Sequence, residues 1–566
     1  MNIMNPGLMR LSTWLVSGLI LAGVALAVNA VALFTGHVFD NVDLRTHYQW
    51  ALQFSDVLAD GTLYPRWMPL ANNGLGEPSF VIVHPGYYYV LALLKSLGLD
   101  LWTAMRWAAA ASTFLVGAVT FGLLYGRLLY PWAIASAMLL QTLPFAAFLF
   151  GFHAALPWHF SFPLAVLVIG LSTIRRQPRV DLLLAVSVAL LCMTHLLVAF
   201  MVLLSLSALQ GLSALRHPMK EDRASLLPWA GSVALGLGLS AVYWLLAATS
   251  ESLFSVVTRI DDHYLNWRNS FVFPFVTSAI FGTRWAVVQW VMPIIPSVFL
   301  LVSAWALAAQ RHQQGEIWHA ASRLWIVGAF ALLMSSELAY PLYASIPFLT
   351  KVQWPYRFLT VSSIAGALAV AMVASAAFSN SGKVLIRGAI VACALLSVAL
   401  LLALQFKQYV EGASPGLGTK TMAGHIGQRG AEPASIGPDW KRYVEDGALD
   451  GYCRRNGLVC EMQFAHSHHR IWRITSDKAR EVLLPLFAFP AWQVSVDEVL
   501  VAETIDQATG LIAVQIPPGS HSVSVRWSLL WQEQAGLALS AFSLVVCAIV
   551  FVVQRRRKMT NPLTVN

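Results

Sequence analysis

Charged residues are scarce in this chain, and their scarcity excludes most soluble classes of protein. Only 11% of the 566 residues are Asp, Glu, Lys or Arg, whereas 57% are hydrophobic. A soluble globular protein carries about 25% charged residues, and a disordered protein is poor in hydrophobic ones. The composition therefore predicts a mainly α-helical polytopic membrane protein, in which each crossing needs about 20 apolar residues.

Cysteine is also rare, and acidic residues are fewer than basic ones. Five cysteines in a chain of this length exclude a disulfide scaffold. The 37 Lys and Arg residues outnumber the 28 Asp and Glu residues, which gives a formal net charge of +9. In a membrane protein such an excess orients the loops, so we expect no nucleic-acid partner.

Long stretches without any charged residue predict the membrane crossings. They are 11–34, 107–126, 128–174, 182–215, 224–250, 285–310, 324–336, 358–382, 388–406 and 535–554. Two of them are too long for one crossing. The stretch 128–174 must fold back near 151–157, and 182–215 must turn near Thr194-His195, because basic residues flank both of its ends. Twelve crossings then place the basic residues on one side, with both termini cytoplasmic.

The first crossing has an alternative interpretation as a cleavable signal peptide. The Ala-rich sequence near Ala30 resembles a cleavage site. However, the apolar run is longer than the core of a typical signal peptide, and more crossings follow it. We therefore expect an uncleaved first helix.

The segments between the crossings predict the domain organisation. Segment 85–97 is apolar and aromatic, but a crossing there would reverse every later helix, so we predict a short helix on the outer surface. We expect a transmembrane domain at 1–406 with an outer loop at 35–105. A β-rich extracytoplasmic domain at 407–533 and a last helix with a basic tail at 534–566 follow. The inner loops are short, so an active site is expected on the outer face.

The first outer loop carries the candidates for acid–base chemistry. Asp43 and His47 are four residues apart, so they share one face of a helix that is expected to end near Asp60-Gly61. Ionisable residues at a membrane surface are functional candidates by default. We predict Asp43 as a catalytic base with Asp40 as its main rival, and His47 as a residue that orients a neighbour. The alternative is a solvated loop whose charges are incidental.

Further candidates lie in two other outer segments. Asp261 and Asp262 offer hard oxygen ligands for Mg²⁺ or Mn²⁺, but adjacent residues on a helix face different ways, so a solvated loop is favoured. Arg259 suits a phosphate clamp or an interface anchor equally well. Lys351 and Arg357 stand at the mouth of a helix, where an anionic lipid headgroup or simple snorkelling would explain them.

The region before the last helix alternates as β-strands do. Segments 482–487, 492–496, 511–515 and 522–527 predict a small β-sandwich. Cys453 and Cys460 are seven positions apart there, and an oxidising outer compartment would allow a local disulfide. A metal site at His466, His468 and His469 is disfavoured, because His469 points away from the other two on a strand.

Histidines that flank the outer turns have a simpler interpretation. His153, His159 and His195 stand in otherwise apolar sequence. We expect each of them to be a packed or hydrogen-bonded residue rather than a ligand.

Several motifs together resemble one bacterial family of polytopic membrane proteins. In the first loop they are Asp43-x-x-x-His47, Gly61-x-x-Tyr64-Pro65-Arg66-Trp67-x-Pro69, Asn73-Gly74-x-Gly76-x-Pro78-x-Phe80 and Pro85-x-x-Tyr88. Further along they are Val352-Gln353-Trp354-Pro355-Tyr356-Arg357-Phe358, Phe489-Pro490-Ala491-Trp492 and Val514-x-Ile516-Pro517-x-Gly519-x-His521. The chain is similar to the "6-pyruvoyl-tetrahydropterin synthase-related" membrane proteins, to YfhO-like proteins and, more distantly, to GT-C glycosyltransferases.

The resemblance implies transfer of a sugar from a polyprenyl-phosphate donor to a glycan, lipid or protein acceptor. The reaction would occur on the outer face of the bacterial inner membrane, and the GT-C acid of the first outer loop maps onto Asp43, without a clearly paired second acid. The predicted substrate-binding set is Arg66, Trp67, Glu77, Arg259, Lys351, Gln353 and Arg357. No cofactor is certain, although Mg²⁺ or Mn²⁺ would suit the acidic pair.

Two other classes of function remain open. A transporter or flippase for lipid-linked glycans would need charged residues along a path through the membrane. The predicted crossings hold hardly any, which favours the enzyme. A non-catalytic assembly subunit that binds glycan through its β domain is the third alternative.

Overall fold

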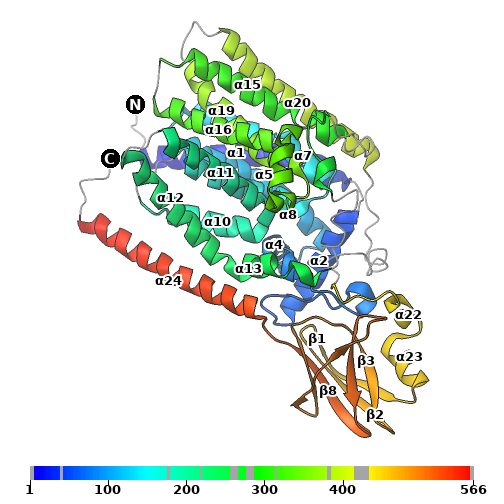
Figure 1. Cartoon of the computed structure of the whole chain (residues 1–566). Coiled ribbons are helices and arrows are strands. Elements are labelled where there is room, and N and C mark those ends of the chain that lie inside the picture. Colours follow the sequence, from blue (N-terminus) through cyan, green and yellow to red (C-terminus); the bar gives the residue numbers. More distant parts are fainter. Residues whose placement is uncertain are drawn as a thin grey trace.

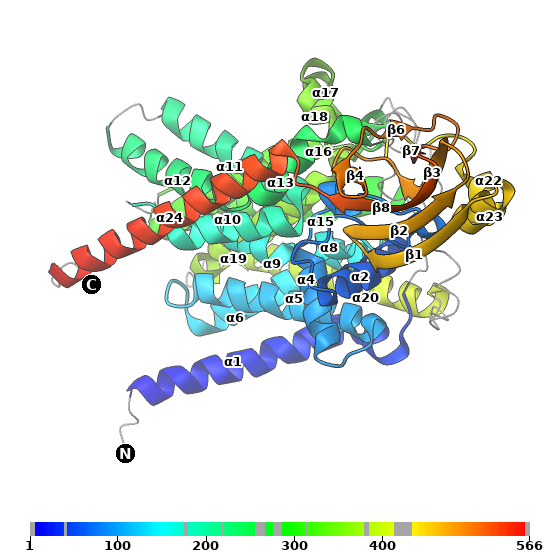
Figure 2. The same cartoon turned by 90° about the horizontal axis from the view of Figure 1, so that it is seen from below.

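The helices of the protein form one bundle, and its strands form a separate domain at one end. The computed structural model describes residues 6–38, 42–174, 179–216, 220–254, 266–275, 286–312, 315–378, 384–412 and 433–560. Helices α1 (Pro6–Val28) and α24 (Trp531–Thr560) lie on the outside of the bundle, and their terminal ends point away from the strands (Figures 1 and 2). The first and last helices therefore begin and end at the face of the bundle opposite the β-sheets.

Ten helical segments in the described part of the chain are long and apolar enough to cross a membrane, and the bent pair α12–α13 makes eleven. A further apolar helix, α10, has 13 residues, and so spans only about 20 Å of a hydrocarbon core of about 30 Å. These segments lie at the positions of the twelve predicted crossings, but only ten, or eleven with the bent pair, are long and apolar enough to cross a membrane among the described residues. In chain order after α1 they are α5 (Leu101–Leu124), α6 (Tyr130–Gln141) with α7 (Pro144–Gly151), α8 (Leu156–Phe160) with α9 (Phe162–Thr173), α10 (Leu182–Thr194), α11 (Leu196–Arg216), α12 (Lys220–Leu239) with α13 (Ala241–Thr249), η6 (Val287–Val291) with α15 (Ile294–Ala309), α16 (Glu316–Ser335), α19 (Leu359–Phe378), α20 (Val384–Glu411) and α24.

Helix α19 is the centre of the bundle. Of its span, 94% is buried, against 11% for α24. Its sequence is apolar on every side and rich in small residues, which is typical of a helix that other helices surround. It packs closely on α15 and α16, and the short helix η8 (Pro355–Phe358) leads directly into it.

The crossing predicted at 224–250 is not a single straight helix. Its two halves, α12 and α13, meet at an angle of 77°. At the break, the Ser240 hydroxyl donates to the carbonyl of Gly236 (3.0 Å), and such a bond one turn back bends helices. Gly236 and Gly238 let α12 approach its neighbours, since a Cβ on Gly238 would lie 2.0 Å from Oγ of Ser543 in α24. The bend brings α13 to the end of the bundle next to the β domain, where Leu246 joins the core of that domain (Figure 1).

The segment predicted as the first outer loop folds into short helices that pack on one another. They are α2 (Val42–Ala59), η2 (Ala71–Gly74), α3 (Ser79–Ile82) and α4 (Gly86–Ser96). Helix α4 has 11 residues and is too short to cross a membrane, as the sequence predicts. Its Tyr88 is fully buried, while Lys95 pairs with Asp56 of α2 (2.6 Å). Helix α2 ends just before Gly61, at the predicted position.

The other outer segments contain several short helices. Those described are η1 (Val31–Thr35), η3 (Glu251–Leu253), η5 (Trp267–Asn269), η7 (Glu337–Ala339), α17 (Tyr340–Ser345), α18 (Pro347–Thr350), α22 (Trp440–Glu445) and α23 (Ala448–Arg455).

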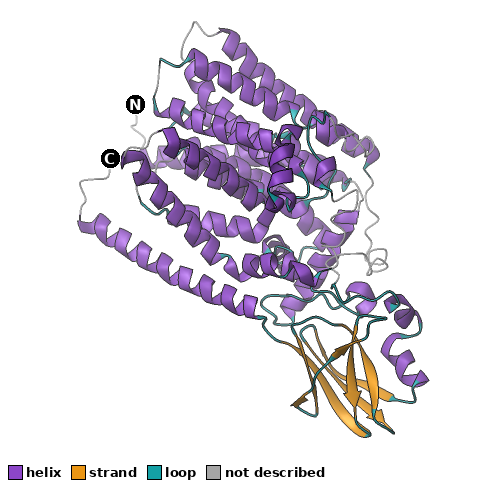
Figure 3. Ribbon diagram, viewed as in Figure 1, coloured by secondary structure: helices purple, strands orange, loops and turns teal. Residues whose placement is uncertain are grey.

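The C-terminal strands form the predicted β-sandwich (Figure 3). They are β1 (Val459–His466), β2 (His469–Ser476), β3 (Arg480–Phe487), β4 (Trp492–Val496), β5 (Val499–Leu500), β6 (Thr504–Ile505), β7 (Leu511–Ile516) and β8 (Gly519–Trp527). One sheet has the order β1-β2-β8-β4-β5 and the other β3-β7-β6, with antiparallel pairing throughout. Alternate residues such as Trp472, Ile474, Val482 and Val523 are fully buried between the sheets.

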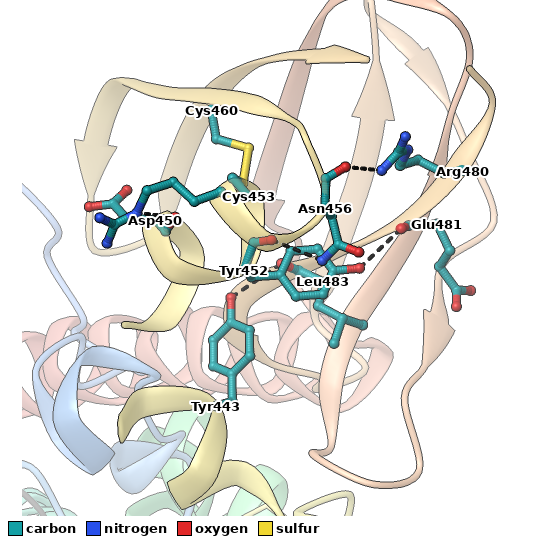
Figure 4. Close-up of a disulfide and its surroundings, with 10 residues drawn as sticks. Tyr443, Asp450, Tyr452, Cys453, Asn456, Cys460, Arg480, Glu481 and Leu483 are labelled. Atoms are coloured by element: carbon teal, nitrogen blue, oxygen red, sulfur yellow. Dashed lines mark hydrogen bonds between the residues drawn. A yellow bond between two sulfur atoms is a disulfide. The ribbon is translucent and has the colours of Figure 1, made fainter. Parts of the chain in front are cut away.

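A disulfide joins the helical edge of this domain to its first strand. It links Cys453 of α23 to Cys460 of β1 (Figure 4). Beside it, the Tyr452 hydroxyl donates to the carbonyl of Glu481 (3.2 Å), and the Tyr443 hydroxyl donates to that of Leu483 (3.3 Å). These bonds hold α22 and α23 against β3.

The first outer loop and the β-sandwich share one hydrophobic core. Trp67 is fully buried and packs edge-on against Trp492, with ring centroids 5.1 Å apart. The backbone N–H of Phe487 donates to the carbonyl of Leu75 (3.1 Å). Two segments more than 400 residues apart in the chain are thus locked together.

Gly76 allows this close packing, and its replacement is expected to destabilise the protein. A Cβ there would lie 2.2 Å from Nε1 of Trp67, and the residue has a left-handed φ of +81°. Gly76→Ala should lower the free energy of unfolding by about 1–3 kcal/mol, which thermal unfolding would measure. Gly98→Ala is the matched control, because Gly98 also has a left-handed φ (+95°) but open space around it. Equal effects of the two substitutions would mean that the Trp67 contact is unimportant.

Candidate functional site

The first two turns of α2 present the predicted acid and its neighbouring histidine. Asp43 and His47 lie on the same face of the helix. Nδ1 of His47 is 2.6 Å from the Tyr88 hydroxyl on α4, and one turn further the Trp50 indole donates to Oε1 of Glu77 (3.1 Å). The packing of α2 on α4 therefore fixes the direction in which this face points.

The turn before α19 holds Arg357 in a buried aromatic setting. Gln353 has a left-handed φ of 61°, a strained conformation for a residue other than glycine. The guanidinium of Arg357 lies 4.3 Å from the centre of the Trp354 ring and 5.6 Å from that of Trp158. Its Nη1 donates to the Val352 carbonyl (2.7 Å) and to Oε1 of Gln353 (3.4 Å). Arg357 is only 8% exposed, and its Nε has no hydrogen-bond partner among the described residues.

Three more outer segments bring imidazole rings to the same end of the bundle. His84 precedes α4, and its ring centre lies 4.6 Å from that of His195, at the break between α10 and α11. His153 lies between α7 and α8, and its Nε2 is 3.3 Å from the Tyr356 hydroxyl. With His47, four histidines from four segments converge around Arg357.

Burial and nearby charges shift the pKa values of the ionisable groups in this cluster. Burial raises the pKa of the Asp43 carboxyl above its ordinary value, and the positive charge of Arg357 partly offsets this effect. Burial, with the charge of His153, lowers the pKa of His47 to about 3. Burial, with the neighbouring His47 and Arg357, lowers that of His84 to about 3, and burial with Arg357 lowers that of His153 to about 4. These imidazoles are therefore neutral near pH 7.

The arrangement suits the transfer of a proton next to a bound anion. A carboxylate with a raised pKa accepts a proton more readily than an ordinary aspartate does. A guanidinium binds phosphate strongly, and neutral imidazoles exchange hydrogen bonds with hydroxyl groups. Asp43 makes no ion pair with any residue that the structure describes. Its charge and that of Arg357 are therefore both available to a ligand.

Arg66 has a different place from the one predicted for it. Its Nε forms an ion pair with Glu533 of α24 (2.9 Å), and both side chains are buried. Its other nitrogens donate to the carbonyls of Phe80 and Val242, each at 3.3 Å. All of its side-chain nitrogens are thus engaged at the junction of the loop, α13 and α24, and a role of Arg66 in phosphate binding stays a prediction.

Trp67 and Glu77 also belong to the packing of the first loop. Trp67 is part of the core shared with the β-sandwich. Glu77 is 2% exposed and accepts hydrogen bonds from Trp50 and Ser79. Glu77 therefore holds α2 against the loop that follows it.

The remaining predicted residues are spread around the site or outside the described chain. Lys351 is half-exposed and pairs with Glu251, which ties α18 to η3. Gln353 touches Arg357 directly. The structure does not describe Asp40, Arg259, Asp261 or Asp262. In the part of the chain it does describe, no three His, Cys, Asp or Glu side chains converge in a way that would hold a metal ion.

The sequence alone did not indicate the convergence of the histidines. His153 and His195 were expected to be packed residues, and His84 was not singled out. Their common signal is position, since each stands at an outer turn between apolar segments. That signal becomes specific only when several such turns are known to meet at one place.

Comparison with known proteins finds distant structural neighbours. No family model and no curated protein sequence matches the chain. The arabinofuranosyltransferase AftD from mycobacteria has a TM-score of 0.42 at 13% identity, over 91% of this chain and 40% of AftD. The oligosaccharyltransferase of Archaeoglobus fulgidus, tethered with an acceptor peptide, gives 0.39 at 13% identity, over 77% of this chain and 59% of that enzyme.

ArnT of Cupriavidus metallidurans bound to undecaprenyl phosphate gives a TM-score of 0.39 at 15% identity, over 79% of this chain and 83% of ArnT. This chain thus spans less than two thirds of the first two neighbours. TM-scores of this size reflect a distant likeness, so the function is argued from the residues of the site.

Proposed function

We propose that the chain is a membrane glycosyltransferase that moves a sugar from a polyprenyl-phosphate donor to an acceptor hydroxyl. The observation that carries the proposal is the electrostatic influence of the buried Arg357 guanidinium on Asp43, a carboxylate without an ion pair among the described residues, at the end of the bundle that carries the β-sandwich. The motifs of the first loop and of the turn at 352–358 support the same activity. In our proposal this face is extracytoplasmic, the termini are cytoplasmic and the membrane is the bacterial inner one.

The proposed reaction inverts the configuration at the sugar carbon. Asp43 accepts the proton of the acceptor hydroxyl while the hydroxyl oxygen forms a bond to the anomeric carbon. The bond from that carbon to the phosphate oxygen breaks, and its electron pair leaves with the phosphate. Arg357 stabilises the departing phosphate, with Gln353 as a positioning residue through its bond to Nη1. The leaving phosphate needs no proton, so one carboxylate is sufficient.

Reconstitution of the full-length chain in liposomes with a radiolabelled polyprenyl-phosphate sugar would test the proposal. Formation of a new glycan product supports the enzyme. Movement of the labelled lipid across the bilayer without product would establish a flippase instead. If neither product nor movement of the lipid is detected, the remaining role is that of a non-catalytic assembly subunit.

The pH dependence of kcat/KM is expected to show the raised pKa of Asp43. The base must be ionised to accept a proton, so activity should fall as the pH is lowered through that pKa. Because burial raises the pKa, the acidic limb should lie at higher pH than the usual range of an aspartate. His47 and His153 titrate at about 3 and 4, so no further step is expected from them near pH 6.5. An acidic limb at or below the ordinary aspartate value would contradict this role of Asp43.

A further inference from the structure

A second cleft lies between the β-sandwich and the beginning of α24, and nothing in the proposed reaction uses it. Its volume is about 500 Å³, within the usual range of ligand sites. One wall consists of the membrane-side ends of β1, β2 and β8, with His466, His469 and Arg526. The other wall contains Leu529 and Leu537 from the segment that forms α24.

The strand wall of the cleft carries an uncompensated positive charge. Arg526 is exposed, and it forms no hydrogen bond or ion pair with any of the described residues. His469 lies directly opposite it on β2. Among the described residues, the only carboxylate that lines the cleft is that of Glu533, which is fully buried and already paired with Arg66. The charge of Arg526 is therefore open to an anion.

The opposite wall continues into the lipid-facing surface of α24. Leu529 is 49% exposed and Leu537 is 44% exposed. Beyond them only 11% of the α24 span is buried in protein. Trp531 is 67% exposed at the start of the helix, where tryptophan commonly marks the boundary between hydrocarbon and headgroups. The cleft thus opens at the depth of the lipid headgroups.

We propose that this cleft binds an anionic phospholipid. The phosphate contacts Arg526, the imidazoles of His466 and His469 hydrogen-bond the headgroup, and the acyl chains lie along Leu537 and the exposed face of α24. A carbohydrate fits the cleft less well, because sugars stack on open aromatic faces. His466 stacks on one face of the Phe464 ring, with centroids 5.6 Å apart and planes 10° apart, and Trp527 packs against Phe489 and Trp492. This proposal does not depend on the glycosyltransferase activity.

Lipid binding to the purified full-length chain would test it directly. Native mass spectrometry in detergent, with phosphatidylglycerol added, should show a bound lipid whose affinity falls about fivefold in Arg526→Gln, the effect of one basic residue near a membrane surface. Lys478→Gln is the matched control. It removes a positive charge from the same domain at the turn after β2, far from the end of the strand that carries His469. It should leave the affinity unchanged.

Several results would overturn the lipid site. Equal affinities for phosphatidylglycerol in Arg526→Gln and the unmodified chain would show that the charge does not bind lipid. If Arg526→Gln lowers the affinity for zwitterionic phosphatidylcholine as much as the affinity for phosphatidylglycerol, the cleft does not select for an anion. Competition by inorganic phosphate alone would assign the cleft to a free anion. Binding of an oligosaccharide that depends on Arg526, while lipid binding does not, would assign the cleft to a glycan.

Discussion

Asp43→Asn is expected to abolish sugar transfer while the protein still folds and inserts into the membrane. The substitution keeps the size of the side chain but removes the group that accepts the proton. One positioned base contributes about 10²–10⁴-fold to a rate, so kcat should fall by at least that range. A radiolabelled donor in proteoliposomes would measure the loss, and the midpoint of thermal unfolding would verify the fold.

Asp56→Asn provides a control for Asp43→Asn on the same helix. Asp56 is exposed and pairs with Lys95, away from the histidine cluster. Exposed ion pairs contribute little to stability, so both activity and stability should be close to those of the unmodified chain. Near-normal product from Asp43→Asn would reject Asp43 as the base. Loss of product from both variants would point to a general effect on the first loop.

Glu533→Gln is expected to destabilise the protein more than any other single change considered. It leaves the buried charge of Arg66 without a counterion, and removing one partner of a buried pair costs about 3–5 kcal/mol. The Glu533 carboxylate also accepts a hydrogen bond from the backbone of Leu530 at the start of α24 (2.9 Å). Thermal unfolding of the purified protein should show a clear fall in the midpoint.

Two further variants separate the ion pair from other effects of Glu533. Glu445→Gln changes an exposed carboxylate on α22 and should leave the midpoint unchanged. The double substitution Arg66→Met with Glu533→Leu replaces the pair by apolar groups and should recover most of the lost stability. A double variant as unstable as Glu533→Gln would show that the buried charge was not the cause.

Features of the sequence that are local in the chain predicted the fold well. The charge-free stretches and the basic residues at their ends predicted the crossings, including the break at His195. The short length of 85–97 predicted α4, and alternation predicted the sandwich strands. The 77° bend between α12 and α13 could not be predicted from hydropathy. Hydropathy carries no information on the hydrogen bond from the Ser240 hydroxyl to the Gly236 carbonyl, or on the contact of Gly238 with α24.

The candidate site was predictable only in part, for a physical reason. Asp43 and His47 share a helical face at a spacing that the sequence displays, and the turn at Arg357 carries its own motif. The approach of His84 to His195 depends on tertiary packing between residues that are 111 positions apart in the chain. For Arg66, the sequence shows a cation near the membrane but does not show Glu533, its partner near the other end of the chain.

The shared core of Trp67 with Trp492 has a consequence for how the protein is made. Synthesis proceeds from the N-terminus, so the first loop is made long before the strands that complete its packing exist. Until then Trp67 lacks its partner Trp492, and a chain that ends before Trp492 leaves this part of the first loop unpacked. Only a fully translated polypeptide can complete the core that the first loop shares with the β-sandwich, so premature products are candidates for chaperones and proteases rather than for partial activity.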